Sequence, residues 1–282
     1  MNKNNEEIKK QIFKSVREIE IKTNKLVNTL IYGNFQSVFL GNGIDFMDLR
    51  EYIPGDDIRF IDWKSSARKD EIFIKKYNEE RESVYCFILD YSKSMFFRKK
   101  LEFSLLLLSG MMMYAAKNNN TFYVFTLSNK LNFLGRFKQI KDVYFVTELI
   151  VDDILENSQE ILKSKKFELK DALKKISFRN YTHTIIISDF FFENFEKELN
   201  YLKTIDFLAL QVISNIELNP KTGIYELDGI RILTENKRFK ETIANKQKEI
   251  KRIFLKKGYK FFTLDCENDL FQEIKKILIK VS

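Results

Sequence analysis

The sequence is poor in cysteine and histidine. It holds two cysteines, Cys86 and Cys266, and a single histidine, His183, among 282 residues. The cysteines lie far apart and form no CxxC pair, which argues against a disulfide framework or a zinc ribbon and favours reduced thiols in a cytoplasmic protein. No cysteine, serine or carboxylate beside His183 defines a catalytic pair, so we expect a structural histidine at a strand end.

Nucleotide-binding motifs and long apolar runs are also absent. Neither GxxxxGK[ST] nor GxGxxG occurs, so we do not expect the chain to hydrolyse ATP by itself. Residues 1–16 lack the apolar run of a secretory signal. The most apolar helix candidate, Leu101–Ala116, contains Glu102 and two serines and is shorter than the about 20 residues of a bilayer span. These absences predict a cytoplasmic protein that reaches the inner membrane only through partners.

The sequence is rich in hydrophobic and aromatic residues that can form a core. Hydrophobic residues make up 44% of the chain and aromatic residues 14%, enough to bury a sizeable core. Four apolar segments alternate with helical patterns, which indicates βαβ units, a mostly parallel sheet and helices on both of its faces. The predicted core strands are residues 83–90, 121–128, 182–189 and 206–214.

An irregular, charged N-terminal region precedes this alternation. The change in pattern near residue 82 predicts an N-terminal region over residues 1–82 and an α/β domain over residues 83–282. Shorter strands are expected at 58–63, 71–77 and 260–265, and a hairpin at 223–235. Helices are expected at 5–30, 101–117, 139–154, 168–177, 193–204, 238–257 and 268–280.

Positive charge is concentrated near the C-terminus. The chain has a net charge of +8, and residues 237–282 carry 13 Lys and Arg against 6 Asp and Glu. The helix predicted at 238–257 is amphipathic with a basic outer face, where nucleic acid or an acidic partner could dock. No aromatic stacking platform or RNA motif accompanies it, so a solvated lysine-rich face is the favoured interpretation and nucleic acid is an alternative partner.

The segment FILDYSKSMFF ends a predicted core strand with three alternating oxygen side chains. Asp90, Ser92 and Ser94 can point the same way, and Asp189 ends another predicted strand. In parallel sheets ligands bind outside the carboxyl ends of the strands, so the two aspartates converge if the strands are neighbours. Carboxylate and hydroxyl oxygens suit Mg²⁺. The alternative is that the serines cap the helix beginning near residue 99.

Upstream of this segment, residues 48–82 contain a dense motif, REYIPGDDIRFIDWKSSAR. It resembles the core block R-x-Y-x-P-G-D-D-x-R-x-I-D-W-x-x-S-A-R of the domain of unknown function 58 family. The matching residues are Arg50, Tyr52, Pro54, Gly55, Asp56, Asp57, Arg59, Ile61, Asp62, Trp63, Ser66, Ala67 and Arg68, with Gly41, Gly43, Asp45 and Phe46 upstream. The resemblance covers about residues 30–100 strongly and the remainder in outline.

The resemblance implies a von Willebrand factor A-like fold with a metal-ion-dependent adhesion site. Asp90, Ser92 and Ser94 match the D-x-S-x-S motif of that site, and Asp189 matches its third-loop aspartate. The family's second-loop threonine is replaced by Phe167, which weakens the expected Mg²⁺ site. The resemblance also implies a non-enzymatic adaptor that works with a MoxR-type AAA+ ATPase and other von Willebrand A proteins in assembling or maturing client proteins.

Two questions stay open at this level. The charged residues of the signature block, among them Asp62 and Arg68, form either a docking surface with Trp63 as an anchor or an internal ion-pair network with Trp63 buried. The strand-end aspartates, Asp90 and Asp189, could also serve a Mg²⁺-dependent phosphoesterase, although no nucleophile and base accompany them.

Overall fold

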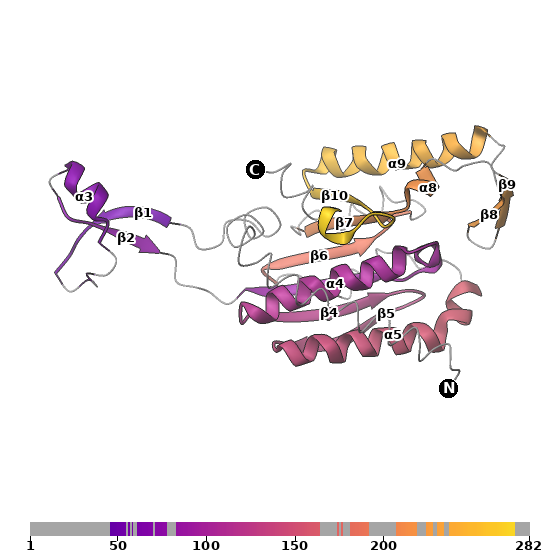
Figure 1. Cartoon of the computed structure of the whole chain (residues 1–282), viewed down its shortest axis with the longest axis horizontal. Helices are drawn as coiled ribbons and strands as arrows, with labels where there is room; N and C mark the ends of the chain where they lie inside the picture. The colour runs from indigo at the N-terminus through magenta and orange to yellow at the C-terminus, as the bar shows by residue number, and fades with distance from the viewer. Residues whose placement is uncertain are drawn as a thin grey trace.

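A six-stranded sheet organises the chain, with its strands in the order β10-β7-β6-β3-β4-β5 (Figure 1). Neighbouring strands are parallel except β4 and β5, which are antiparallel. Two further antiparallel pairs, β1–β2 and β8–β9, stand outside this sheet. The computed structural model describes residues 46–54, 56, 58, 61–69, 71–77, 83–163, 174, 176, 181–191, 207–218, 224–227, 230–233 and 237–273.

The elements follow one another from an N-terminal strand pair to the last sheet strand. In chain order they are β1 (Phe46–Glu51), α3 (Trp63–Lys69), β2 (Phe73–Tyr77), β3 (Val84–Asp90), the 3-10 helix η3 (Lys93–Phe96), α4 (Lys100–Lys117), β4 (Thr121–Leu127), β5 (Leu131–Phe137), α5 (Ile140–Lys163), β6 (His183–Ser188), β7 (Phe207–Ile213), α8 (Asn215–Leu218), β8 (Ile224–Leu227), β9 (Ile230–Leu233), α9 (Lys237–Lys257) and β10 (Lys260–Asp265).

Both faces of the sheet are covered, as the continuous apolar runs of its central strands require. In β3 the alternate residues Phe87 and Leu89 face a core shared with α4 and α5, while Cys86 and Ile88 face a second core shared with α9. The fold class predicted from the sequence is therefore confirmed. Both cysteines are buried free thiols: Cys86 lies in the core shared with α9, and Cys266 lies in the core shared with α4 and α5.

The order of the strands creates a topological switch point between β3 and β6. The chain leaves β3 toward β4 on one side, whereas it leaves β6 toward β7 on the other. At such a point the loops at the carboxyl ends of the two strands diverge and leave a crevice that suits a ligand. The loops that follow β3 and β6 are the ones on which the sequence places Asp90 and Asp189.

Most sequence-predicted elements appear with small shifts in their ends. The four core strands and the hairpin are present, the strand at 260–265 is reproduced as β10, and the helix predicted at 139–154 continues to Lys163. The edge strand β5 was not predicted, because its mixed residues are only half-buried and lack an apolar run. The helix predicted at 268–280 is described only over 270–273, and those at 5–30 and 193–204, like most of 168–177, lie outside the described residues.

The strand predicted at 58–63 is wrong. Ile61 makes one isolated bridge to Ile74, and helix α3 begins at Trp63. The cause is Asp62, whose side chain accepts hydrogen bonds from the N–H groups of Lys64 and Ser65 and so caps the helix. No described helix combines the length and apolar content needed to cross a bilayer.

The core between the sheet and α9 gives a direct stability test. Phe254 is fully buried, and its ring centroid lies 4.4 Å from that of Phe261 and 5.2 Å from that of Phe190. We expect Phe254→Ala to lower the free energy of unfolding by about 3–5 kcal/mol in denaturant titrations. Leu255, which is 69% exposed on the same helix, is the matched control, and Leu255→Ala should change it by less than about 0.5 kcal/mol. Equal losses in the two variants would contradict the packing described for α9.

Candidate functional site

The register of β3 against β6 places Ser188 beside Asp90. Leu89 is opposite Ile187 in this parallel pair, so the next residues of the two strands are neighbours. The Ser188 Oγ–H donates a 2.6 Å hydrogen bond to Asp90 Oδ2, and the N–H of Ser92 donates to Asp90 Oδ1 at 2.8 Å. Asp90 is fully buried, yet these two donors are neutral, so neither cancels the charge of its carboxylate.

Two hydroxyl groups that follow Asp90 lack hydrogen-bond partners. The side chains of Ser92 and Ser94 are both buried, and within the described part of the chain neither Oγ makes a hydrogen bond of good geometry, although the Ser92 side chain lies close enough to Asp90 to oppose the rise of its pKa. A buried hydroxyl without a partner costs about 1–3 kcal/mol, so such groups indicate a ligand or ion that the structure does not contain. Oxygen donors of this kind, next to a carboxylate, fit a hard divalent cation. The serine caps considered as an alternative are not formed, because α4 begins after Lys99 with no side-chain cap hydrogen bond, and Ser92 makes none at the start of η3 either.

Asp189 points away from Asp90 and toward helix α4. Its Oδ2 accepts a 3.0 Å hydrogen bond from Lys100 Nζ, and its Oδ1 accepts one of 3.0 Å from the N–H of Phe191. Alternation along β6 explains this direction, since Ser188 lies on the face of Asp90 and the next residue lies on the other. Asp189 is still close enough to Asp90 for its negative charge to act on it.

Lys100 is the unexpected member of the site. It begins α4, is completely buried, and donates a second hydrogen bond of 2.7 Å to Glu217 Oε1. Glu217 is fixed by the glutamate half of a capping box, in which the N–H of Ser214 donates to Glu217 Oε2. The N–H of Glu217 donates to the Ser214 carbonyl, and the Ser214 hydroxyl donates to Glu267. Burial lowers the pKa of Lys100, but its two carboxylate partners outweigh burial and raise it above the usual value.

The sequence could not identify these additional residues. Lys100 is one of three consecutive basic residues, with Arg98 and Lys99, and nothing in their pattern shows which one is buried. Glu217 was detectable only as a capping signal, in the Ser214–Glu217 pattern S-x-x-E. His183, by contrast, lies where it was expected, at the start of β6, with its ring 5.0 Å from that of Tyr85.

The candidate ligands of an ion are therefore Asp90, Ser92 and Ser94. The described residues contain no group of three or more His, Cys, Asp and Glu side chains arranged to hold a metal, so an ion here would depend on the serine hydroxyls. Phe167, which replaces the family's threonine, lies outside the described residues.

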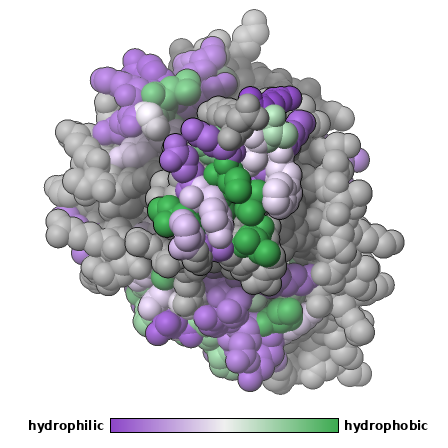
Figure 2. All heavy atoms as spheres, turned by 90° about the vertical axis from the view of Figure 1, so that its left-hand side faces the viewer, coloured by the Kyte–Doolittle hydropathy of each residue, from purple (hydrophilic) through white to green (hydrophobic). Residues whose placement is uncertain are grey.

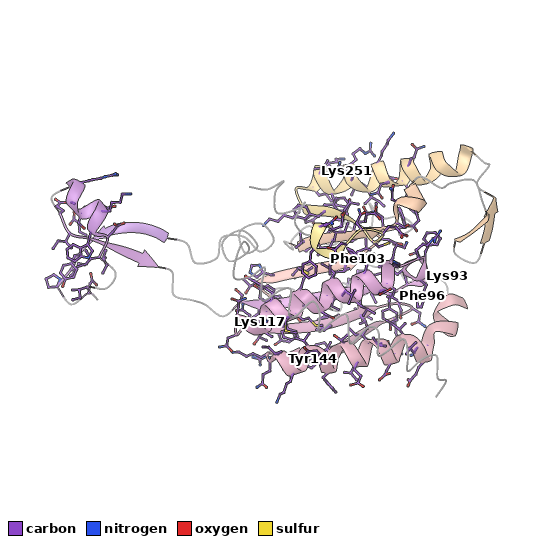
Figure 3. The ribbon with its side chains drawn as sticks, viewed as in Figure 1. Lys93, Phe96, Phe103, Lys117, Tyr144 and Lys251 are labelled. Atoms are coloured by element: carbon purple, nitrogen blue, oxygen red, sulfur yellow. The ribbon has the colours of Figure 1, made fainter. Side chains whose placement is uncertain are left out.

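Three basic residues follow Asp90 closely in the chain. Lys93 is half-buried on η3, and Arg98 and Lys99 are exposed in the turn before α4. Figure 3 shows Lys93 and Phe96 at the end of the sheet where α4 begins, which is the end that carries Asp90. Positive groups around a buried acidic centre favour an approaching carboxylate.

The signature block is described in part, and its described contacts are local. Asp56 closes a turn by accepting the Ile53 N–H at 2.9 Å, and Asp62 caps α3. Arg50 lies in β1, Tyr52 donates its N–H to the Ile72 carbonyl, Pro54 lies in the Ile53–Asp56 turn, and Arg68 is exposed, while Gly55, Asp57 and Arg59 are outside the described residues.

Trp63 is 69% exposed, so the interpretation in which it is buried is wrong. Ile53, Ile58 and Ile72 are also exposed, and Figure 2 shows apolar side chains interspersed with polar ones on the face it presents. Large apolar side chains that stay exposed are a feature of surfaces that contact another molecule.

The buried charge of Asp90 makes stability depend on pH. Burial, and then the charge of Asp189, raise the pKa of Asp90 from 3.8 to about 6, while the hydrogen bonds from Ser188 and Ser92 oppose the shift. Because the pKa of Asp90 is higher in the folded state than in the unfolded state, the folded state favours the protonated carboxyl group. The stability that this group contributes is complete below about pH 4 and is lost as the pH rises through about 6.

We therefore expect Asp90→Asn to become more stable relative to the native chain as the pH is raised from about 5 to about 8 in EDTA, by roughly 1 kcal/mol, because only about one pH unit of the interval between the two pKa values lies in this range. Denaturant unfolding at several pH values measures the difference. Glu249→Gln, at an exposed position on α9, should follow the native pH profile. A native-minus-variant difference that stays flat with pH would contradict a buried, uncompensated carboxylate.

Comparison with known proteins gives the family. Residues 48–254, most of the chain, match the family described as "Protein of unknown function DUF58". Among solved structures, the chain is similar to the conserved hypothetical protein BatB from Bacteroides thetaiotaomicron (18% identity, TM-score 0.42, covering 69% of this chain and 98% of that one). It is also similar to an aerotolerance-related membrane protein from Bacteroides fragilis (14% identity, TM-score 0.41, covering 70% of this chain and 99% of that one). A third similar structure is a von Willebrand factor type A protein from Catenulispora acidiphila (10% identity, TM-score 0.37, covering 71% of this chain and 42% of that one). The search of curated proteins gave no match. The chain belongs to the DUF58 family.

Proposed function

We propose that this chain is a non-enzymatic protein-interaction module with a Mg²⁺-dependent site at the carboxyl ends of β3 and β6. Asp90, Ser92 and Ser94 would hold the ion, and an Asp or Glu side chain of a partner protein would complete its coordination shell. The observation that carries the proposal is the pair of buried serine hydroxyls that make no well-formed hydrogen bond within the described part of the chain, next to an aspartate whose described donors are all neutral.

The charge of the buried groups also supports a divalent cation. Asp90, Asp189 and Glu217 can contribute three negative charges, and Lys100 contributes one positive charge. Buried charges are stable only when they are paired or neutralised. Two positive charges are missing from this set, which is the charge of Mg²⁺. In its absence, protons serve the same purpose, consistent with the raised pKa values of Asp90 and Glu217, for which burial is the largest cause.

The same geometry does not favour a two-aspartate phosphoesterase. In that reaction both strand-end carboxylates would act on one metal-bound phosphate, whereas Asp189 is bonded to Lys100. The basic helix α9 buries Ile250, Ile253 and Phe254 and exposes Lys251 and Arg252, the pattern of an ordinary amphipathic cover for a sheet. We therefore propose a protein partner rather than a phosphoester or nucleic acid.

For the partner, the family resemblance points to a MoxR-type AAA+ ATPase, together with other von Willebrand A proteins, in the assembly or maturation of client proteins. The basic residues around the opening, Lys93, Arg98 and Lys99, would attract an acidic segment of that partner. We propose that the module works in the cytoplasm and meets the membrane only through such partners.

Calorimetric titration with Mg²⁺ and with Mn²⁺ tests the ion site. We expect a single site per chain, and Asp90→Ala should weaken it at least about a hundredfold, because it removes the carboxylate that would bond directly to the ion. Glu249→Ala, which removes an exposed carboxylate, should bind the ion as the native chain does. Equal affinity in the native chain and Asp90→Ala, or no binding to either, would exclude the site.

Capture of a MoxR-type ATPase encoded near this protein's gene tests the partner. Immobilised native chain should retain the ATPase in Mg²⁺ and release it in EDTA, and Asp90→Ala should fail to retain it. Retention that EDTA and Asp90→Ala both leave unchanged would place the contact elsewhere, for instance on the exposed surface around Trp63, which Trp63→Ala would then weaken.

A further inference from the structure

The buried ammonium group of Lys100 joins three loops of the site. Lys100 itself follows the β3–α4 turn, Asp189 follows β6, and Glu217 follows β7. Its Nζ lies 3.0 Å from Asp189 Oδ2 and 2.7 Å from Glu217 Oε1, and all three side chains are excluded from solvent. A fully buried lysine is rare, and removing one member of such a cluster is expensive because its partners stay buried and charged.

Aromatic rings separate this ion pair from water. The ring centroid of Phe97 lies 5.8 Å from Lys100 Nζ, and that of Phe191 lies 5.9 Å from it. Ring faces attract a cation, and a dry surrounding strengthens its attraction to carboxylates. Lys100 is therefore a fixed charge of the fold rather than a mobile surface group.

Asp189 is held from several sides at once. Besides Lys100, the N–H of Phe191 donates to its Oδ1, and Gln211 Nε2 donates to its carbonyl at 2.9 Å. The next residue, Phe190, has a φ of +57°, which is uncommon for a bulky side chain, and its ring is completely buried. These contacts fix the direction of the Asp189 carboxylate toward Lys100.

The two strand-end aspartates are consequently not equivalent. Among the described residues, Asp90 receives hydrogen bonds only from neutral groups, whereas the ammonium group that Lys100 also shares with Glu217 contacts Asp189. An ion next to Asp90 would thus find one carboxylate without a cationic partner and a second that already has one.

We propose that Lys100 sets the charge of the ion site by neutralising Asp189 and keeping it out of direct contact with the ion. The inference rests on the proposed function for the presence of an ion. Asp90 then supplies the one negative charge among the proposed direct ligands, so Mg²⁺ and these ligands together keep a net positive charge, which the remaining buried negative charge balances only from a distance. That charge is what makes the loaded site bind a partner's carboxylate instead of being satisfied by the chain's own two aspartates.

The positive charge of Lys100 can be removed without leaving both of its carboxylate partners, Asp189 and Glu217, charged and unpaired. Lys100→Met combined with Glu217→Gln deletes one positive and one negative charge, and the side-chain amide oxygen that Glu217→Gln leaves in place can still accept the Ser214 N–H that forms the capping box. Methionine also suits a space between aromatic rings. Glu217→Gln alone is the matched control, because it keeps the contact between Lys100 and Asp189.

Calorimetry with Mg²⁺ and Mn²⁺, and then with a short Asp- and Glu-containing peptide on the Mn²⁺-loaded protein, measures the two consequences. Circular dichroism checks that each variant is folded. In the double variant we expect metal affinity to rise roughly tenfold over Glu217→Gln, the scale of one unit charge several ångströms away. Peptide affinity should fall by a similar factor, because Asp189 now competes for the ion.

A second comparison does not require the removal of Lys100. Asp189→Asn leaves Lys100 paired one-to-one with Glu217. If Lys100 keeps Asp189 away from the ion, Asp189→Asn should lose far less metal affinity than Asp90→Asn. Equal losses in these two variants would mean that both aspartates bind the ion directly and would overturn the inference, even if the double variant did not fold.

The outcomes separate this inference from the proposed function. If the native chain binds metal but the double variant binds it no better than Glu217→Gln, Lys100 is a structural ion-pair partner and only the inference fails. If the native chain binds no metal and the double variant does, the proposed function fails, and the inference fails with it because it needs an ion in the native chain. If none of the proteins binds metal, both are excluded.

Discussion

The parallel pairing of β3 with β6 is the constraint on which the site depends. Its register puts Leu89 opposite Ile187, and the last two positions follow from that pairing without further choice. Asp90 must then lie beside Ser188, and Asp189 must turn to the opposite face, where α4 begins. A shift of one residue would exchange the two faces of β6, bury Ser188 against α4 and bring Asp189 next to Asp90. Hydrophobic packing on both faces of the sheet thus determines which aspartate stays uncompensated.

The loops after these strands are built to hold charge in a dry place. Phe190 adopts a positive φ, and Gln211 connects the carbonyl of Asp189 to Gln247 on α9. Such backbone strain persists only where surrounding contacts overdetermine it, and it is often found at binding sites. Here the contacts come from a fully buried ring and a fully buried amide, so the sheet and α9 together support the position of one carboxylate.

Sequence patterns were sufficient for the parts of the fold that rest on apolar periodicity. The central strands are continuous apolar runs, and β10 was predicted to the residue because a turn at Gly258 and the end of the apolar run at Asp265 bound it. The same patterns placed Asp90 at the end of a core strand. They could not show that Lys100 is buried, because a lysine at the first turn of a helix is ordinarily solvated and its burial depends on Asp189 and Glu217 from distant loops. Nor could they distinguish Ser188 from Asp189 as the neighbour of Asp90, since that follows from register alone.

A tethered lysine and an exchangeable ion both neutralise carboxylates, but they have different consequences for a protein. Lys100 is part of the chain, so the charge it compensates is compensated in every folded molecule, whatever the ion concentration. The groups around Asp90 are different, because the unpartnered oxygens of Ser92 and Ser94 cost the fold only about 1–3 kcal/mol each when no ion is present. A domain that buries as much apolar surface as this one can bear that loss and remain folded. Dividing the charge in this way would allow folding to be independent of Mg²⁺, while the proposed contact with a carboxylate partner would depend on it.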